Sequence, residues 1–388
     1  MELFWLEHKK LWRKKIVKIC VLLCFVYCVI FGSILSFQWF SFGSSDDYTS
    51  AFGNNFDGYT VIKDSQEYAL SFGGELTDET LQQIVSDYQQ MEADGMEKEL
   101  EKTDWQIVNS WLGTLYPELR DTSNYKTMIS YVDPDKLTGF YERRQQVLDG
   151  FLEISGQVGA EKEFLHQMER KVEKPFHYEW VEGWSTLLGS MVADLGVVMA
   201  LFLGIVLSSL FAGEWRDNTS TLVLTTRNGW GKIALAKILT GFAFTVELFA
   251  LLAVSSVISQ LFFMGTAGWD MPIQNIKLIA VAPMNMLQAE IYEYAFVLLG
   301  AIGFAGIVMF ISAAVKNNVL TLLLSLAVVY GPMMIAEYLP YEMQKALDLI
   351  PLVGSSTDIF RTNTFRIFGK LICCLLYTSP SPRDRQKS

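Results

Sequence analysis

Five long apolar runs recur along the sequence, and polar segments of very different lengths separate them. Such runs occupy about residues 16–40, 187–212, 233–263, 295–315 and 319–339. A helix needs roughly 20 predominantly apolar residues to cross the hydrocarbon core of a bilayer. Each of these runs reaches that length. The pattern therefore predicts an integral membrane protein with helical spans.

A sixth apolar run starts near Ile367 and stops at Leu376, about 10 residues later, which is too short to span a bilayer. The sequence Leu-Leu-Tyr-Thr-Ser-Pro-Ser-Pro-Arg-Asp at 375–384 resembles one reading frame of a transposase adapter used to prepare DNA for sequencing. An apolar helix that changes abruptly into such a sequence fits a read-through junction. We therefore interpret residues 374–388 as a non-native tail that truncates the sixth span. A genuine disordered basic tail is the alternative.

One long polar region, residues 41–184, separates the first span from the second. The first 15 residues alternate Leu, Phe and Trp with Lys, which predicts an amphipathic interfacial helix on the cytoplasmic side (1–15). A secretory signal peptide is the competing interpretation, but the run at 16–40 is longer than a signal-peptide core and lacks a following cleavage site. With the N-terminus inside, residues 41–184 are expected to form an extracytoplasmic domain, and residues 185–373 to hold spans 2–6 with short loops.

The polar region contains mostly helical patterns. Thr77, followed by Asp78 and Glu79, is a typical helix cap with acidic residues in the first turn. The apolar positions after it have helical spacing: Leu81, Ile84, Val85 and Tyr88. Similar patterns predict further helices at 105–115, 134–154 and 161–172, and apolar stretches at 59–62 and 68–72 predict one or two strands. Without a phosphate loop or a nucleophile elbow, this region is not expected to be catalytic.

Between the third and fourth spans we expect an outer loop at about 264–294. The fourth span contains Gly300, Gly303 and Gly306, small residues that allow close helix approach in lipid. The predicted fold class is mainly α: an integral membrane six-helix bundle, its sixth helix truncated, with a large and mostly helical extracytoplasmic domain between spans 1 and 2.

Composition and charge agree with this organisation. The chain has 388 residues, of which 51% are hydrophobic, and a net charge of -11. The acidic residues concentrate between about 44 and 182, whereas the expected cytoplasmic segments are basic. An acidic surface argues against nucleic acid as a partner. The polar region has no cysteine, and Cys20, Cys24 and Cys28 share one face of an apolar helix, where we interpret them as packing residues rather than acylation or redox sites.

Two carboxylates and one charged connection are the candidate functional features. Asp194 and Glu247 fall inside predicted spans, where a carboxylate must face a cavity, a cation or the helix bundle. Each is either a substrate or proton site or a buried, hydrogen-bonded helix contact; for Asp194, simple nearness to the outer membrane interface is a further alternative. The connection at 211–239 joins spans 2 and 3, and its basic balance favours the cytoplasmic side. Its charged and aromatic candidates are Glu214, Trp215, Arg216, Asp217 and Arg227.

The order of these segments resembles the ABC-2 type permease family, the membrane subunits of bacterial ABC exporters. The segments that carry the resemblance are Phe211-Ala212-Gly213-Glu214, Asn218-Thr219, Leu222-Val223-Leu224-Thr225-Thr226, the stretch 229–232, Ala236-Lys237-Ile238, Pro272-Ile273-Gln274 and Ser312-Ala313-Ala314-Val315-Lys316. They extend over nearly the whole chain up to residue 373.

The resemblance implies a permease subunit in the bacterial cytoplasmic membrane that is not itself an enzyme. Gly231-Lys232 is followed by Ile233 and lacks the spacing of a phosphate-binding loop. ATP and Mg²⁺ would therefore bind a separate ATPase subunit, and this chain would hold no cofactor. The resemblance maps the contact with that subunit onto the 211–239 connection, with Glu214, Trp215, Arg216, Asp217 and Arg227, and onto Lys9–Lys15. It also implies a homo- or heterodimer of permeases. For the charged residues of the mapped ATPase contact, ordinary solvation of a loop with lipid-headgroup pairing is the alternative.

Two other classes of function remain open from the sequence. A sensory or signalling membrane protein would bind a ligand through the extracytoplasmic domain without transport. An intramembrane enzyme would need convergent polar residues at one depth, and Asp194 and Glu247 alone are too few. The transported substrate does not follow from the sequence.

Overall fold

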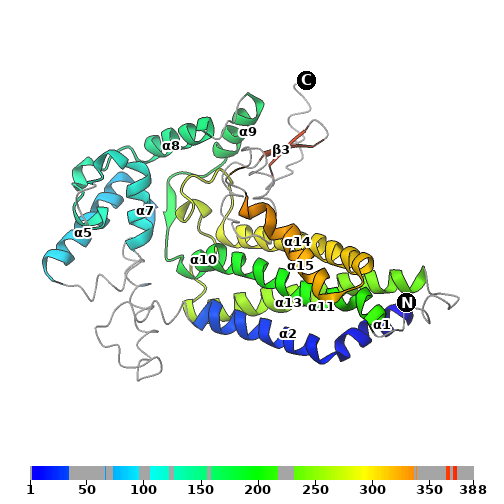
Figure 1. The fold of residues 1–388 in the computed structure, drawn as a ribbon. Coiled ribbons are helices and arrows are strands. Elements are labelled where there is room, and N and C mark those ends of the chain that lie inside the picture. Colours follow the sequence, from blue (N-terminus) through cyan, green and yellow to red (C-terminus); the bar gives the residue numbers. More distant parts are fainter. Residues whose placement is uncertain are drawn as a thin grey trace. The chain divides into compact units, whose positions relative to one another are not determined.

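The computed structural model describes residues 2–34, 66, 73–95, 105–121, 126–154, 159–216, 231–335, 338, 364–367 and 370–373. These residues are mainly helical (Figure 1). They divide into two compact units. The first, here named the membrane unit, contains residues 1–36, 186–265 and 290–356; the second, the polar unit, contains residues 37–185, 266–289 and 357–388.

Among the residues that the structure describes, three helices are long and apolar enough to cross a membrane. The first is continuous from Glu182 to Trp215 and comprises α10 (Glu182–Thr186), the π-helical stretch η5 (Leu187–Met191) and the long α11 (Val192–Arg216). The others are α13 (Lys232–Met264) and α14 (Met286–Val315). They coincide with predicted spans 2, 3 and 4, so the part of the chain that the structure describes has the helices of a membrane protein.

The remaining helices of the membrane unit are shorter. At the N-terminus, α1 (Glu2–Arg13), α2 (Lys15–Val26) and the π-helical η1 (Tyr27–Ile34) follow one another, and residues 35–40 of predicted span 1 lie outside the described residues. The fifth predicted span corresponds to α15 (Asn318–Met334), which has 17 residues. Spans 1 and 5 therefore stay predictions as membrane crossings.

Two expectations about secondary structure in the second half of the chain were wrong. The outer loop expected up to residue 294 ends earlier, because α14 begins at Met286. Asn285 and Gln288 form a reciprocal cap there: Gln288 N donates to Asn285 Oδ1 at 2.9 Å, and Asn285 N donates to Gln288 Oε1 at 3.2 Å. The described residues of the apolar run after Ile367 are not helical; β3 (Thr364–Ile367) and β4 (Lys370–Cys373) pair antiparallel. Gly369 in the middle of this short run disfavours a helix.

Close helix packing in the membrane unit uses glycines other than those expected. A Cβ added to Gly204 of α11 would lie 2.7 Å from Leu322 of α15, and one added to Gly241 of α13 would lie 2.3 Å from Sδ of Met309. At Gly303 and Gly306 an added Cβ would meet no described atom within 4 Å. Among the described residues, no close helix approach is therefore seen at these two glycines of α14, and the approach expected there stays a prediction.

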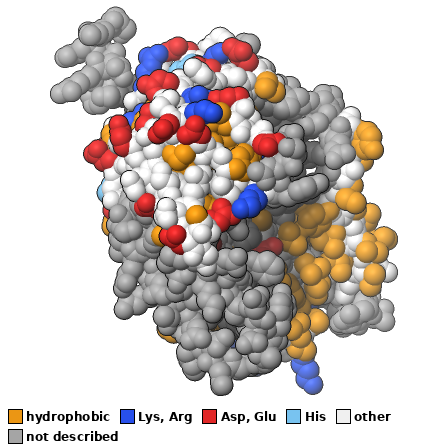
Figure 2. Space-filling model, turned by 90° about the vertical axis from the view of Figure 1, so that its left-hand side faces the viewer, with side chains coloured by type: hydrophobic (Ala, Val, Ile, Leu, Met, Phe, Trp, Pro, Cys, Tyr) orange, Lys and Arg blue, Asp and Glu red, His pale blue; other side chains and the backbone are white. Residues whose placement is uncertain are grey.

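The polar unit has its own helical core. Its helices are α5 (Asp78–Ala93), α7 (Trp105–Leu115), α8 (Phe140–Ile154) and α9 (Ala160–Glu169), and β1 (Gly74–Leu76) pairs antiparallel with β2 (Phe176–Tyr178). Thr77 caps α5 as predicted, accepting a hydrogen bond from Thr80 N at 3.2 Å. Trp111, Phe140 and Phe176 meet edge to face in the core. Charged side chains are scattered over the described surface of this unit (Figure 2).

Helix α8 begins later than predicted. Its pattern starts at Pro134, but residues Pro134–Lys136 form a separate 3-10 turn and the helix begins at Phe140. Gly139, between them, has φ of 72°, a left-handed conformation that interrupts a right-handed helix. The predicted strands at 59–62 and 68–72 and the tail at 374–388 lie outside the described residues.

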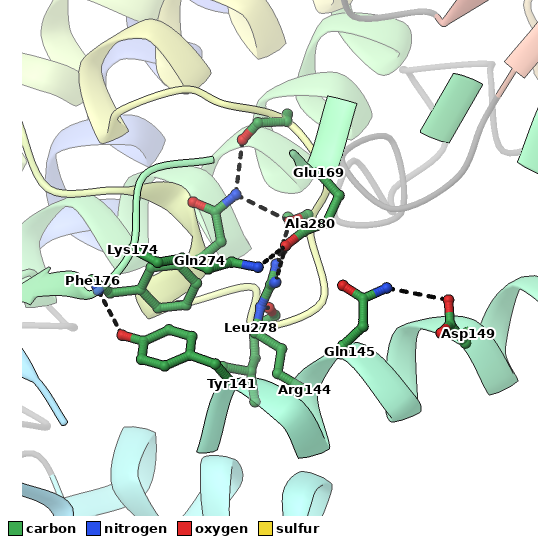
Figure 3. A network of polar contacts seen from close by, with 11 residues as sticks. Tyr141, Arg144, Gln145, Asp149, Glu169, Lys174, Phe176, Gln274, Leu278 and Ala280 are labelled. Carbon is green, nitrogen blue, oxygen red and sulfur yellow. Dashed lines mark hydrogen bonds and ion pairs between the residues drawn. The ribbon is translucent and has the colours of Figure 1, made fainter. Parts of the chain in front are cut away.

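The segment 266–289, which connects α13 to α14, belongs to the polar unit and is held there by Arg144. This guanidinium is fully buried and forms a bidentate pair with Glu169, and it also donates to the carbonyls of Leu278 at 2.6 Å and Ala280 at 3.0 Å. Gln274 Nε2 adds bonds to the Ala280 and Ala282 carbonyls (Figure 3). A buried charge is tolerated only when it is paired and hydrogen-bonded. This network therefore fixes the path of segment 266–289.

Candidate functional site

The candidate site is a set of charged and polar contacts where α11 ends and α13 begins. Glu214 lies in the last turn of α11, and its Oε1 atom is 2.6 Å from Nζ of Lys237 on α13 and 3.8 Å from Nζ of Lys10 on α1. The Lys237 side chain is 2% exposed and also donates to the Leu210 carbonyl at 2.8 Å. Cations near the last turn of a helix complement its dipole and its free carbonyls. One carboxylate thus joins three helices.

A second contact attaches α14 to the same end of α11. The Ser312 hydroxyl on α14 donates to the Ser208 carbonyl at 2.6 Å and accepts from the amides of Phe211 at 3.3 Å and Ala212 at 3.1 Å. Lys14, which lies between α1 and α2, donates from Nζ to the Ser209 hydroxyl at 3.0 Å. The last two turns of α11 are therefore held by side chains from α14 and from the N-terminal segment.

Trp215 extends the site to the turn between α14 and α15. Its ring lies under Lys316, whose Nζ atom is 3.8 Å from the ring centroid, close enough for a cation–π interaction. Lys316 has φ of 59°, which fits a tight turn between two helices. Trp215 remains 39% exposed. It therefore presents an aromatic surface beside the buried Glu214–Lys237 pair.

The sequence-predicted site residues are only partly described. Glu214 and Trp215 lie together as stated. Arg216 is the last residue of α11, and its side chain is not described, while Asp217 and Arg227 lie outside the described residues. Sequence reasoning missed the role of Lys237, although a lysine within an apolar helix is itself a signal that a partner carboxylate is near.

Glu247 is a contact between α13 and α1. Its Oε2 atom accepts a hydrogen bond from Trp12 Nε1 at 3.0 Å, and its Oε1 atom lies 3.2 Å from His8 Nε2. His8 and Trp12 are four residues apart and so share one face of α1. Trp12 also packs edge to face on Phe244. Of the two interpretations made from the sequence, this geometry favours a hydrogen-bonded helix contact.

Asp194 has a different partner from Glu247. It lies in the first turn of α11 with an exposed side chain, and it interacts with the hydroxyl of Tyr27 in η1.

Two further carboxylates, Glu290 and Glu293 of α14, are 3% and 1% exposed. Sequence reasoning missed them because it placed them in an outer loop. The Asn285 and Gln288 capping pair would have moved them into the helix.

Metal and thiol chemistry find little support in the described residues. No group of three or more His, Cys, Asp or Glu side chains among them could hold a metal ion. Cys20, Cys24 and Cys28 are free thiols buried in the helix core, in agreement with their interpretation as packing residues. The polar contacts above connect α11 with α1, α13 and α14.

Comparison with known proteins adds no assignment. No family model, curated protein or solved structure matches the chain.

Proposed function

We propose that this chain is the transmembrane permease subunit of an ABC exporter, which moves a substrate across the bacterial cytoplasmic membrane. A separate ATPase subunit would bind ATP and Mg²⁺ and drive the transport. The observation that carries the proposal is the Glu214 contact with Lys237 and Lys10, which ties α11, α13 and α1 together beside the 217–230 connection. The resemblance in segment order supports the same function.

The proposed mechanism is a rigid-body one. A motor subunit that pushes on the connection would move the last turn of α11, which is fixed to α13 through Lys237 and to α14 through Ser312. Because these contacts are short and mostly buried, the helices would move together rather than slide past one another. The exposed Trp215 and the basic N-terminal residues offer the surface that the motor would touch. A dimer of such permeases would enclose the substrate path.

A co-purification experiment tests the proposal. The chain is expressed with the product of a neighbouring reading frame that contains a phosphate-binding loop, and is purified through a tag on the chain. Trp215→Ala should reduce both the amount of bound ATPase and its stimulated hydrolysis, because it removes exposed contact surface. Trp269→Ala is the matched control, since Trp269 is an exposed tryptophan of the polar unit at 50%. Equal ATPase binding and hydrolysis for wild type and Trp215→Ala would contradict the coupling role.

A sensory function would give a different result. If the chain senses a ligand through the polar unit and does not transport, an ATPase should neither bind the chain nor respond to it. The neighbouring reading frame would then encode a histidine kinase or a protease.

A further inference from the structure

A groove of about 940 Å³ runs between α1 and the first half of α13. Its walls are mainly apolar: Leu3 and Leu6 come from α1, and Leu235 and Leu239 come from α13. The lining contains two charged side chains, Glu2 and Lys232, at the first residues of these two helices. The groove therefore has an apolar lining with one acidic and one basic side chain.

The apolar wall of the groove is largely exposed. Leu6 is 63% exposed, Leu235 56% and Leu239 47%. Leaving so much contiguous apolar surface in water is unfavourable, and such patches mark binding surfaces or contact with lipid. Since α13 is long and apolar enough to cross a membrane, acyl chains are the apolar material at hand.

The two charges of the groove differ from Lys10 and Lys237 on the same two helices. Lys10 and Lys237 both pair with Glu214. Glu2 and Lys232, by contrast, form no ion pair with any other described side chain. The first turn of α13 adds the positive end of its helix dipole beside Lys232. The groove therefore offers a cation and a carboxylate that a ligand could satisfy together.

We propose that this groove binds a phospholipid with an ethanolamine headgroup. The lipid phosphate would accept hydrogen bonds from Lys232, and the primary ammonium would donate to the Glu2 carboxylate, with one acyl chain along the leucines. Charge-assisted bonds of this kind are the strong ones. A choline headgroup has no N–H to donate to Glu2, and a glycerol headgroup has no cation for it. The proposal does not depend on the transport role.

A second groove in the same unit provides an internal comparison. It has a volume of about 610 Å³ and is lined by Phe25 with Leu251, Val254, Ile258 and Phe262 of α13, together with smaller residues. Its lining contains no charged side chain. It would accept acyl chains of any phospholipid without regard to the headgroup.

Photocrosslinking in proteoliposomes of the full chain tests the proposal. The probe is phosphatidylethanolamine with a diazirine in one acyl chain, and mass spectrometry locates the labelled peptides. We expect label on residues 2–6 and 235–243, and unlabelled phosphatidylethanolamine should compete for it at about tenfold lower concentration than phosphatidylcholine or phosphatidylglycerol. Glu2→Gln and Lys232→Gln should each reduce the label about tenfold, the loss expected for one charge-assisted hydrogen bond. Label in the second groove should not distinguish the three lipids.

Filling variants supply the matched control. Ala243→Trp narrows the first groove and should remove its label, whereas Ala250→Trp narrows the second and should leave the first unchanged. Equal competition by the three lipids, or unchanged label in both glutamine variants, would overturn the headgroup assignment. Crosslinks between two copies of the chain across the first groove would show that a second copy occupies it and would also overturn the proposal.

Discussion

Glu214 Oε1 lies 2.6 Å from Nζ of Lys237, and this ion pair joins the last turn of α11 to the first turns of α13. Lys237 is 2% exposed and Glu214 is 15% exposed at the side chain, so both charges depend on each other for compensation. Glu214 precedes and Lys237 follows the connection between the candidate membrane helices α11 and α13. Loss of the ion pair should therefore affect both the stability of the membrane unit and any motion passed through the connection.

Lys237→Met should destabilise the protein by about 3 kcal/mol, because it leaves the Glu214 carboxylate largely buried with a weaker partner. Adding Glu214→Gln should recover part of this loss, since the double variant buries no unpaired charge. Thermal unfolding in detergent measures both effects. Lys18→Met, which removes an exposed lysine of α2, is the control and should change the midpoint little. Additive losses in the double variant would show that the two residues do not interact.

Arg144 should resist conservative replacement. Lysine cannot reproduce the forked contact with Glu169 and the bonds to the Leu278 and Ala280 carbonyls together. We expect Arg144→Lys to destabilise the polar unit nearly as much as Arg144→Met, by about 3 kcal/mol. Hydrogen exchange of segment 266–289 should accelerate in both variants. Arg170→Lys is the control, because Arg170 of the same unit is exposed. Unchanged exchange in Arg144→Lys would contradict the clamp.

Two tyrosines of the polar unit, the buried Tyr116 and the partly buried Tyr141, should make its stability fall at alkaline pH. Burial raises the pKa of Tyr116 and of Tyr141 to about 12. Below about pH 10, the ordinary tyrosine pKa, both are neutral in the folded and unfolded states. Between pH 10 and 12 the unfolded chain loses these protons while the folded chain keeps them. Stability is therefore fully present below pH 10 and falls by up to about 3 kcal/mol per tyrosine by pH 12.

Phenylalanine variants separate the two tyrosines. The Tyr116 hydroxyl has no hydrogen-bond partner among the described residues, so Tyr116→Phe should leave stability near pH 7 unchanged and reduce the alkaline fall. Tyr141 donates to the Leu76 carbonyl at 2.7 Å and accepts from Phe176 N at 2.6 Å. Tyr141→Phe should therefore cost about 1–2 kcal/mol already at pH 7. Unfolding midpoints between pH 7 and 11.5 measure both; identical alkaline curves for wild type and Tyr116→Phe would contradict this account.

Gly268 should be the most restrictive glycine of the polar unit. It has φ of 80°, and an added Cβ would lie 2.3 Å from the backbone carbonyl oxygen of Trp180. Gly268→Ala combines a left-handed backbone with a collision, and we expect a loss well above 2 kcal/mol. Gly95→Ala isolates the backbone term, because Gly95 has φ of 69° and nothing within 4 Å. It should cost about 1 kcal/mol. Equal melting midpoints for the two variants would disprove the collision.

Periodic features were predictable from the sequence. The three long apolar helices and the Thr77 cap with the buried Leu81 follow from spacing alone, because a helix face repeats at fixed intervals. The early start of α14 was missed because the Asn285 and Gln288 cap precedes a stretch whose glutamates suggest a loop. Helix boundaries could therefore be predicted only where the capping residues were recognised in the sequence.

Long-range partners were not predictable. Glu214 was a candidate from its position, but the sequence spacing does not predict its pairing with Lys237. The contacts of Glu247 with His8 and Trp12 were likewise not predicted. Arg144 looks like one of several charges on the surface of a helix, yet it is fully buried. Such pairings depend on how helices pack in three dimensions, and a single sequence carries no direct record of those contacts.

The most direct test of the proposed function is the ATP hydrolysis rate of the neighbouring-frame ATPase with and without the wild-type chain in proteoliposomes. The account predicts a stable complex of the two proteins, a higher hydrolysis rate in the presence of the chain, and a loss of that increase in Trp215→Ala but not in Trp269→Ala. Failure of the ATPase to bind the wild-type chain, or a rate that the wild-type chain leaves unchanged, would contradict it.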